Sequence, residues 1–310
     1  MKSFHYLIFL TLFISSVTPA SVPHASVPHA SVSPTRLLFW NLRTFGKGRA
    51  TEAHGIELAS IVSSYDILLF AEIKDADCSS NQFCPIKEFF EKFLPSYHLY
   101  LSPSLYYDTP FKKSGSEQYA ILTKKNISVQ TIEYQDHEST FIRRPFGIQL
   151  TNGVKVLVFH SHPNSETELV SLSKVFRYFG NQKTILLGDL NTGCHYVSFD
   201  TLDQNDIRKD YDWLVPETTL TNADQTCPYD RILSTKDISH SCQQGYVLNQ
   251  NKEAKRIDSD HYPIGIECHL FPKSIRMNNP NKNIWNKRLI FDCILLLFLI
   301  ICLPFLVHFY

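Results

Sequence analysis

Short apolar or β-rich runs recur along the chain, and they constrain its fold more than any other feature of the sequence. The runs cover residues 36–40, 65–70, 97–101, 119–122, 146–150, 154–159, 183–187, 231–233 and 264–267. Runs of this length are typical of short buried strands. Helical stretches at 55–63, 86–93 and 167–179 precede three of them, and the last has its apolar residues on one helix face. The chain is therefore predicted to be an α/β protein with helices outside a β-sandwich or mixed sheets.

Several of these runs end in an acid, an amide or an imidazole. "LLFWN" ends in Asn41, "ILLFAE" in Glu72, "VLVFH" in His160 and "ILLGDLN" in Asp189 and Asn191, and "SDHYP" places Asp260 and His261 before the 264–267 run. One polar strand end is ordinary, because strands end at loops. None of these ends carries Lys or Ser, and the whole set is what a metal-centred acid–base site at one rim of a sandwich needs.

The stretch "LLGDLNTGC" shows the pattern most clearly. Asp189 and Asn191 stand two residues apart after an apolar run, so in extended chain their oxygens face the same side. Hard cations such as Mg²⁺ prefer oxygen ligands of this kind. A plain turn is the alternative, since Gly, Asp and Asn all form turns.

Charge and length limit the remaining possibilities. The 310 residues contain 30 Lys and Arg against 30 Asp and Glu, so no global basic field points to a polyanionic partner. Any contact with nucleic acid must therefore come from a local patch. No internal linker is visible between residues 36 and 272, which predicts one domain over that range.

The N-terminal residues read as a processing signal. Residues 1–20 have one lysine, an apolar run and a small-residue end, which predicts a secretory signal peptide rather than a core helix. Residues 21–35 carry the short duplication "SVPHASVPHASV" and are predicted to be a flexible leader.

The C-terminal residues predict attachment to a membrane. Residues 293–307 are 15 residues without a charge, which is short for a spanning helix of about 20 residues. We expect residues 289–310 to be the discarded tail of a glycolipid-anchor signal, with Asn278 or Asn279 as attachment site within the linker and spacer 273–288. A short membrane helix with Lys287 and Arg288 at the interface is the alternative. Either arrangement predicts a protein outside the cell or at its surface.

Cysteine usage agrees with export. Of eight cysteines, two lie in the C-terminal tail, and the remaining six are expected in disulfides. The six are Cys78, Cys84, Cys194, Cys227, Cys242 and Cys268. Spacing alone does not fix their pairing, and zinc is the rival, although no paired C-x₂-C motifs occur. Asn126 begins the glycosylation sequon Asn-Ile-Ser, which predicts a surface loop there.

The motifs resemble a known family. "WNLRTFG", "FAEIKD", "SEQYA", "FHSHP", "LLGDLNTGC", "TCPYDRIL" and "SDHYP" stand in the order that they have in deoxyribonuclease I. Over residues 36–272 the chain resembles that family, within the wider endonuclease/exonuclease/phosphatase superfamily. The resemblance implies a four-layer α/β sandwich of two packed, mainly antiparallel β-sheets with helices outside. It also implies cleavage of DNA phosphodiesters that depends on Mg²⁺ (or Mn²⁺) and is assisted by Ca²⁺.

The resemblance also implies roles for individual residues. His160 and His261 would be the catalytic imidazoles, oriented by Glu117 and Asp230 respectively. The metal would be bound or positioned by Glu72, Asp189, Asn191, Asp260 and Asn41. DNA would be contacted by Arg43, Lys74, Arg143 and Tyr196. Cys194 and Cys227 would form the family's stabilising disulfide, Cys78 and Cys84 could close a different loop near Glu72, and Cys242 and Cys268 would then remain as a pair.

The sequence departs from the family in places. Gly115 stands where the family has a tyrosine that stacks on a sugar, and Lys112 and Lys113 in a longer loop could partly replace that contact. His162 replaces a small residue, and its role is open.

The chemistry explains these residue types. A metal neutralises a phosphate oxygen, one imidazole takes a proton from water, the other protonates the leaving 3′ oxygen, and a carboxylate behind each imidazole fixes its tautomer. DNA is thus the expected partner, with weak sequence preference, and the membrane is a second through the C-terminal segment. We expect a monomer with no obligate protein partner. A phosphodiesterase or phosphatase for a lipid or sugar phosphate is the alternative, followed by an inactive surface binding protein.

Overall fold

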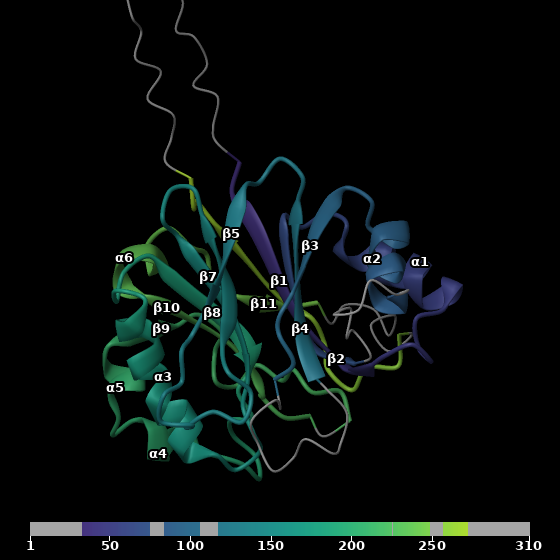
Figure 1. The fold of residues 1–310 in the computed structure, drawn as a ribbon. Coiled ribbons are helices and arrows are strands. Elements are labelled where there is room, and N and C mark those ends of the chain that lie inside the picture. Colours follow the sequence, from purple (N-terminus) through teal and green to yellow (C-terminus); the bar gives the residue numbers. More distant parts are fainter. Residues whose placement is uncertain (1–32, 75–83, 106–116, 225, 249–256, 272–310) are drawn as a thin grey trace, which may run out of the picture. The chain divides into compact units, whose positions relative to one another are not determined.

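The computed structural model describes residues 33–74, 84–105, 117–224, 226–248 and 257–271. In this part of the chain, two six-stranded β-sheets pack face to face, and helices cover the outer face of each (Figure 1). The predicted four-layer α/β sandwich is confirmed.

The first sheet is mixed. Its strands are β1 (Thr35–Phe45), β2 (Ile67–Lys74), β3 (Tyr97–Leu101), β4 (Glu117–Lys124), β11 (Tyr246–Val247) and β12 (Ile264–Cys268). They follow the order β11-β12-β1-β2-β4-β3. β1 and β2 are parallel, and the other neighbours are antiparallel. Because β1 and β2 run in the same direction, their carboxyl ends meet at one edge of the sandwich.

The second sheet repeats this plan. Its strands are β5 (Val129–Glu133), β6 (Phe146–Leu150), β7 (Lys155–His160), β8 (Thr184–Asp189), β9 (Tyr211–Trp213) and β10 (Asp230–Thr235). The order is β5-β6-β7-β8-β10-β9, with β7 and β8 parallel and the other neighbours antiparallel. Both sheets therefore place one parallel pair near their centre.

Apolar residues cover both faces of these central strands. On β1, Leu37 and Phe39 point to the core between the sheets, whereas Leu38 and Trp40 belong to a second cluster on the outer side. Burial on both faces explains why these strands read as continuous apolar runs instead of alternating ones. Each fully buried side chain of this size contributes about 1.5–3 kcal/mol to folding.

The helices form the outer layers. α1 (Glu52–Val62) and α2 (Pro85–Phe93) pack on the first sheet. α3 (Glu166–Tyr178), α4 (Phe199–Leu202) and α5 (Asp206–Lys209) pack on the second, and α6 (Lys236–Ser239) follows β10. Figure 1 shows α1 and α2 beside the first sheet, and α3, α4 and α5 beside the second. Ser165 caps α3, since its Oγ accepts a hydrogen bond from the amide of Glu168.

Two polar residues that were predicted to end strands lie inside them. β1 continues past Asn41 to Phe45, and β2 continues past Glu72 to Lys74. The pairing shifts register at both places, between Asn41 and Phe45 and between Phe70 and Ile73. An irregularity of this kind turns a side chain out of the regular alternation. A polar residue inside an apolar run thus marks a bulge here rather than the end of a strand.

The elements that the sequence did not predict are short or lie at an edge. β9 and β11 have 3 and 2 residues, and α4, α5 and α6 have 4 each, so no periodic pattern can develop in them. β5 is an edge strand whose residues are exposed or half-buried. Such a strand lacks the apolar run by which the others were recognised.

Several predictions concern residues outside the described part of the chain. They are the signal peptide, most of the leader, the linker and C-terminal segment, the loop with Lys112, Lys113 and Gly115, and Cys78. None of the helices within the described ranges combines the length and apolarity that a membrane span requires. The domain boundaries stay a prediction.

Two disulfides have both of their cysteines within the described residues. Cys194 is bonded to Cys227, with an S–S distance of 2.07 Å, and Cys242 is bonded to Cys268, at 2.06 Å. These are the expected pairs. The first connects the loop that follows β8 to the loop that precedes β10. Asn126 is exposed in the turn after β4, where the sequon predicted a surface loop.

Gly188 allows β7 and β8 to meet closely at one edge of the sandwich. It pairs with Phe159 of β7, and a Cβ built on Gly188 would lie 1.9 Å from the carbonyl oxygen of Phe159. No side chain fits at that distance, so only glycine permits this register. The next pair along the two strands is His160 and Asp189.

We therefore expect Gly188→Ala to lower the free energy of unfolding by about 2–4 kcal/mol, because the backbone of β7 or β8 must move. Urea denaturation of the purified protein would measure this loss. Gly48→Ala is the matched control, since a Cβ at Gly48 would have no heavy atom within 4 Å. Equal stability of the two variants would contradict the argument.

Candidate active site

The second sheet brings three of the predicted site residues together through strand register. His160 is the last residue of β7, Asp189 the last of β8 and Asp230 the first of β10. His160 pairs with Asp189 across the parallel strands, and Asp230 pairs with Asp189 across the antiparallel ones. All three are at most 4% exposed. The edge of the sheet thus presents an imidazole and two carboxylates in a row.

The first sheet supplies the opposite side of the site. Asn41 comes from β1, Glu72 from β2 and Glu117 from the start of β4, while His261 precedes β12. The predicted residues of both sheets therefore converge at one edge, although they are far apart in sequence.

Each histidine has a carboxylate behind it. His160 Nδ1 lies 3.0 Å from Glu117 Oε1, and His261 Nδ1 lies 2.8 Å from Asp230 Oδ2. These contacts direct the Nδ1–H of each ring to its carboxylate and leave Nε2 to face the site. Both pairs are buried, so the ring orientations are fixed.

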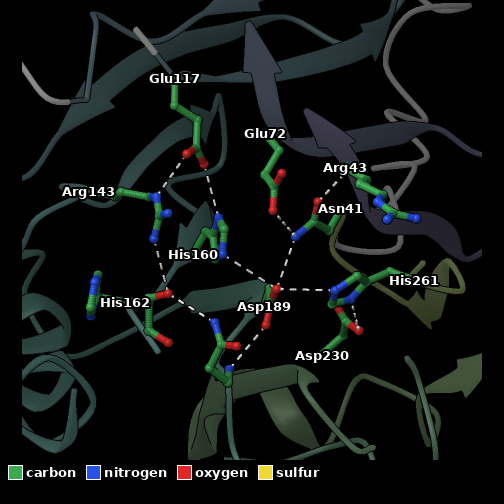
Figure 2. Close-up of polar contacts among 12 residues, drawn as sticks. Asn41, Arg43, Glu72, Glu117, Arg143, His160, His162, Asp189, Asp230 and His261 are labelled. Atoms are coloured by element: carbon green, nitrogen blue, oxygen red, sulfur yellow. Dashed lines mark hydrogen bonds and ion pairs between the residues drawn. The ribbon is translucent and has the colours of Figure 1, made fainter. Parts of the chain in front are cut away.

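Asp189 stands between the two rings. Its Oδ2 is 3.5 Å from His160 Nε2 and 3.6 Å from His261 Nε2, as Figure 2 shows. The arrangement is nearly symmetric, with a carboxylate, an imidazole, Asp189, a second imidazole and a second carboxylate in sequence. It is suited to proton transfer on both sides of one bound group.

Neighbouring carboxylates determine the charge of His261. Burial alone would lower its pKa, but Asp230 and Asp189 outweigh burial and raise the pKa of His261 to about 10. The two carboxylates therefore favour the protonated form of this ring.

His160 follows the same balance. Burial and the positive charge of Arg143 act to lower its pKa, but Asp189 and Glu117 raise the pKa of His160 above the ordinary value of 6.5. Burial would likewise raise the pKa of Asp189, yet the two histidines and the hydrogen bond from Asn41 hold that pKa below its usual value. Asp189 is thus kept ionised inside the protein.

Oxygen ligands for a cation gather on two sides of Asp189. On one side, the Nδ2 of Asn41 donates to both Glu72 Oε1 and Asp189 Oδ2, each at 3.0 Å. A cation bound between these carboxylates would compensate their negative charge, which the neutral amide of Asn41 does only through hydrogen bonds. On the other side, ligand atoms of Asp189, Asp230 and His261 lie within 4.8 Å of one another and form a buried group consistent with a metal site. We favour the first side for Mg²⁺, because Asp230 is already engaged by His261.

The other two predicted metal ligands, Asn191 and Asp260, contact different partners. The Nδ2 of Asn191 donates to the carbonyl of Ser161 at 3.0 Å, and its amide donates to Asp189 Oδ1 at 3.1 Å. The side chain of Asp260 is 28% exposed and lies 4.0 Å from Arg43 Nε. In these positions, Asn191 and Asp260 can hold neighbouring residues of the site in place.

Backbone strain accumulates at these positions. Arg43, Thr44, Glu72 and Asn191 all have positive φ, with values between 46° and 58°. Side-chain-bearing residues rarely adopt this conformation, and it persists where surrounding contacts enforce it. At Glu72 the contact is visible, since Oε2 accepts a hydrogen bond from the amide of Thr44 at 2.8 Å.

The predicted DNA contacts are placed unequally. Arg43 is exposed and pairs with Asp224 at 3.6 Å, Lys74 is half-buried at the end of β2, and Tyr196 is half-buried beside Tyr229. Arg143 is different, because its side chain is only 11% exposed and its Nε donates to Glu117 Oε2 at 3.0 Å. Arg143 therefore braces the carboxylate behind His160.

The sequence analysis missed residues that hold the histidines. Trp40 Nε1 donates to the carbonyl of His261 at 2.8 Å, and Ser259 Oγ accepts from the amide of His261 at 3.1 Å. The hydroxyl of Tyr119 accepts from the amide of His160 at 2.9 Å. The available signal was a side chain with a polar atom one or two positions from a predicted site residue.

Comparison with known proteins relates this site to others. A family model described as the endonuclease/exonuclease/phosphatase family matches residues 38–261, which include every predicted catalytic residue. Deoxyribonuclease gamma from Mus musculus is 30% identical over 268 residues, covering 74% of this chain and 83% of the relative. Deoxyribonuclease-1 from Gallus gallus is 27% identical over 270 residues, covering 74% and 91%. A solved family protein from Leptotrichia buccalis has a TM-score of 0.57 at 19% identity, covering 76% and 99%, and shows the same fold.

The raised pKa of His261 predicts how stability depends on pH. Below the unfolded pKa of about 6.5 the ring is charged in both states, so the ion pair stabilises the folded state fully. As the pH rises towards the folded pKa of about 10, that stabilisation is lost. We expect the free energy of unfolding of the wild type, relative to His261→Gln, to fall between these pH values by on the order of a few kcal/mol.

Urea denaturation in EDTA at several pH values between these limits would measure this difference. His195→Gln is the control, because His195 is exposed and should track the wild type. A difference between the wild type and His261→Gln that stays constant with pH would contradict the raised pKa.

Proposed function

The chain belongs to the endonuclease/exonuclease/phosphatase family, and from this premise we propose that it is a metal-dependent endonuclease for double-stranded DNA. At the coarser level it is a hydrolase of this family, distantly related to deoxyribonuclease I. The observation that carries the proposal is the position of Asp189 between the Nε2 atoms of two carboxylate-backed imidazoles.

A phosphodiester has two positions that need proton transfer. The attacking water loses a proton, and the leaving 3′ oxygen gains one. His160 and His261 present Nε2 from opposite sides of Asp189, so one would act as base and the other as acid. Glu117 and Asp230 would stabilise the imidazolium of each. Both histidines have raised pKa values, so these values do not separate the two roles.

The family is typically dependent on divalent metals, and the residues fit such an ion. We propose that Glu72 and Asp189 bind Mg²⁺ or Mn²⁺, with Asn41, Asn191 and Asp260 positioning it, and that Ca²⁺ assists. When bound, the ion would neutralise a phosphate oxygen and stabilise the charge of the transition state. Asn41 would hold the two carboxylates at the spacing that the ion requires.

Binding of DNA would use the exposed rim of the site. Arg43, Lys74 and Tyr196 are proposed to contact phosphates or the minor groove, which positions DNA without reading its sequence. Arg143 exposes little of its side chain, so its contribution would be a positive charge near the scissile phosphate rather than a broad contact. Weak sequence preference and strong dependence on salt follow from this mode of binding.

The relatives favour DNA over other phosphodiesters. Proteins named deoxyribonuclease match 74% of this chain at 25–30% identity. The Cys194–Cys227 disulfide, which the resemblance implied as the bond that stabilises the family fold, is formed. A lipid or sugar phosphate remains the second candidate substrate, because the metal core of the family alone does not choose among phosphate esters.

Disulfides and the deoxyribonuclease relatives indicate the secretory pathway. We propose a monomer that acts outside the cell or at its surface, held by the C-terminal segment through a glycolipid or a short membrane helix. Release of the surface protein by a phospholipase would distinguish these two anchors.

Plasmid nicking tests the proposed activity. We expect purified protein covering residues 33–273 to nick plasmid with Mg²⁺ and Ca²⁺ but not with EDTA. His160→Ala and His261→Ala should each lower the rate by about 10³-fold or more, because each removes one proton-transfer group. Gel analysis of nicked circles over time gives the rates.

Two controls define what the result means. His195→Ala, at an exposed histidine, should nick like the wild type. If the plasmid stays intact while a lipid or sugar phosphate is hydrolysed rapidly, the substrate is a phosphate ester of the second class and not DNA.

Glu72→Gln tests the metal assignment separately. Loss of one negative ligand should raise the Mg²⁺ concentration for half-maximal nicking by about 10-fold or more, since hard cations depend on carboxylate charge. Glu88→Gln removes an exposed glutamate from α2 and should leave the Mg²⁺ requirement unchanged. An unchanged requirement in Glu72→Gln would remove Glu72 from the metal site.

A further inference from the structure

Glu168 is a buried acid that the proposed mechanism does not use. It lies in the first turn of α3 and is 1% exposed. The stretch Ser165-Glu166-Thr167-Glu168 has the sequence of a capping box, in which the acid would bond to the backbone amide of the capping serine. Only half of that motif forms, since Ser165 caps Glu168 but the carboxylate of Glu168 bonds elsewhere.

The carboxylate joins two loops of the active site. Oε1 accepts a hydrogen bond from the amide of Ile142 at 2.7 Å, and Oε2 accepts one from the amide of His162 at 2.6 Å. Ile142 precedes Arg143, and His162 follows His160 by two residues. One side chain therefore fixes the spacing between the loop before β6 and the loop after β7.

These loops carry the residues that brace His160. Arg143 Nε donates to Glu117 at 3.0 Å, and Arg143 Nη1 donates to the carbonyl of Ser161 at 3.2 Å. The same carbonyl accepts a bond from Asn191 at 3.0 Å. Figure 2 shows Arg143 beside the Glu117–His160 pair, with His162 on the side away from Asp189. A shift of either loop would move the arginine that holds Glu117.

We propose that Glu168 is a positioning residue, which sets the Arg143–Glu117–His160 arrangement by tying both loops to the start of α3. The inference rests on the proposed nuclease function for its kinetic consequences but not for its structural ones. Glu168 itself faces the loops and does not touch the reacting groups.

The energy balance of the buried Glu168 carboxylate agrees with a positioning role. Burial raises the pKa of Glu168, against the hydrogen bonds from His162 and Ile142 that favour the charged form. A buried carboxylate is costly unless it is well bonded, and the N-terminal end of a helix supplies part of the compensation. An apolar residue would fill this space at lower cost but would leave two backbone amides without an acceptor.

Glu168→Gln is the sharpest test. The amide keeps one acceptor oxygen and turns an NH₂ group towards the second backbone amide, so one loop is released. We expect kcat to fall about 10-fold while KM stays within about 2-fold, because positioning acts on the chemical step. Glu166→Gln is the matched control, since Glu166 is exposed in the same helical turn, and its kcat should stay within about 2-fold of wild type.

A double-mutant cycle locates the effect. In an Arg143→Gln background, Glu168→Gln should lower kcat by less than about 2-fold, because the residue through which it acts is already gone. Full additivity of the two losses would overturn the proposal. The proposal would also be overturned if the fractional loss of kcat in Glu168→Gln equalled the fraction of the variant that is unfolded, because the folded molecules would then be fully active.

NMR provides a readout that needs neither activity nor the variant. In the wild type, the amides of Ile142 and His162 and the Nε–H of Arg143 should exchange slowly with solvent. Rapid exchange at these amides would overturn the proposal, even if Glu168→Gln failed to fold. Where the variant folds, the Arg143 signal should be lost in Glu168→Gln and kept in Glu166→Gln. Absence of DNA cleavage by the wild type would refute the nuclease function while these NMR results still decided the role of Glu168.

Discussion

A negative charge buried between two imidazoles is the interaction on which the site depends. Asp189 is 2% exposed, and such a charge is tolerated inside a protein only when neighbours compensate it. The compensation comes from both sheets, since His160 lies on one side, His261 on the other, and Asn41 donates a hydrogen bond. Each imidazole in turn needs its own carboxylate. The symmetry of the site thus follows from the requirement to satisfy one central charge.

The fold makes this arrangement possible through strand register. His160 on β7 and Asp230 on β10 flank Asp189 on the two neighbouring strands, and Gly188 lets β7 approach β8 closely. On the opposite sheet, bulges in β1 and β2 turn Asn41 and Glu72 towards the same edge. Regular strands would have sent those side chains into an apolar layer. At this edge, irregular backbone orients polar groups that regular strands would not bring together.

The sequence predicted these features to different degrees. Strands β3 and β6 were found at their observed bounds, because their apolar runs end sharply. The polar residues that follow the apolar runs made it possible to expect that several strand ends meet at one edge of the sandwich. The partners of the histidines could not, since Glu117 is 43 residues from His160 and Asp230 is 31 residues from His261, and they were assigned only through a family resemblance. Arg143 shows the same difficulty. The resemblance implied a contact with DNA, whereas the contact of Arg143 with Glu117 depends on loops whose spacing no local pattern records.

The origin of the site from both sheets has a consequence for how the protein fails. Asn41, Glu72 and Glu117 belong to one sheet, and His160, Asp189 and Asp230 to the other, so either layer alone holds only half of the groups. A small displacement of one sheet relative to the other would separate the groups of the site before much of the apolar core became exposed to solvent. A damaged or partly assembled copy would thus lose its activity rather than act with altered selectivity, which limits unwanted hydrolysis by a member of this family.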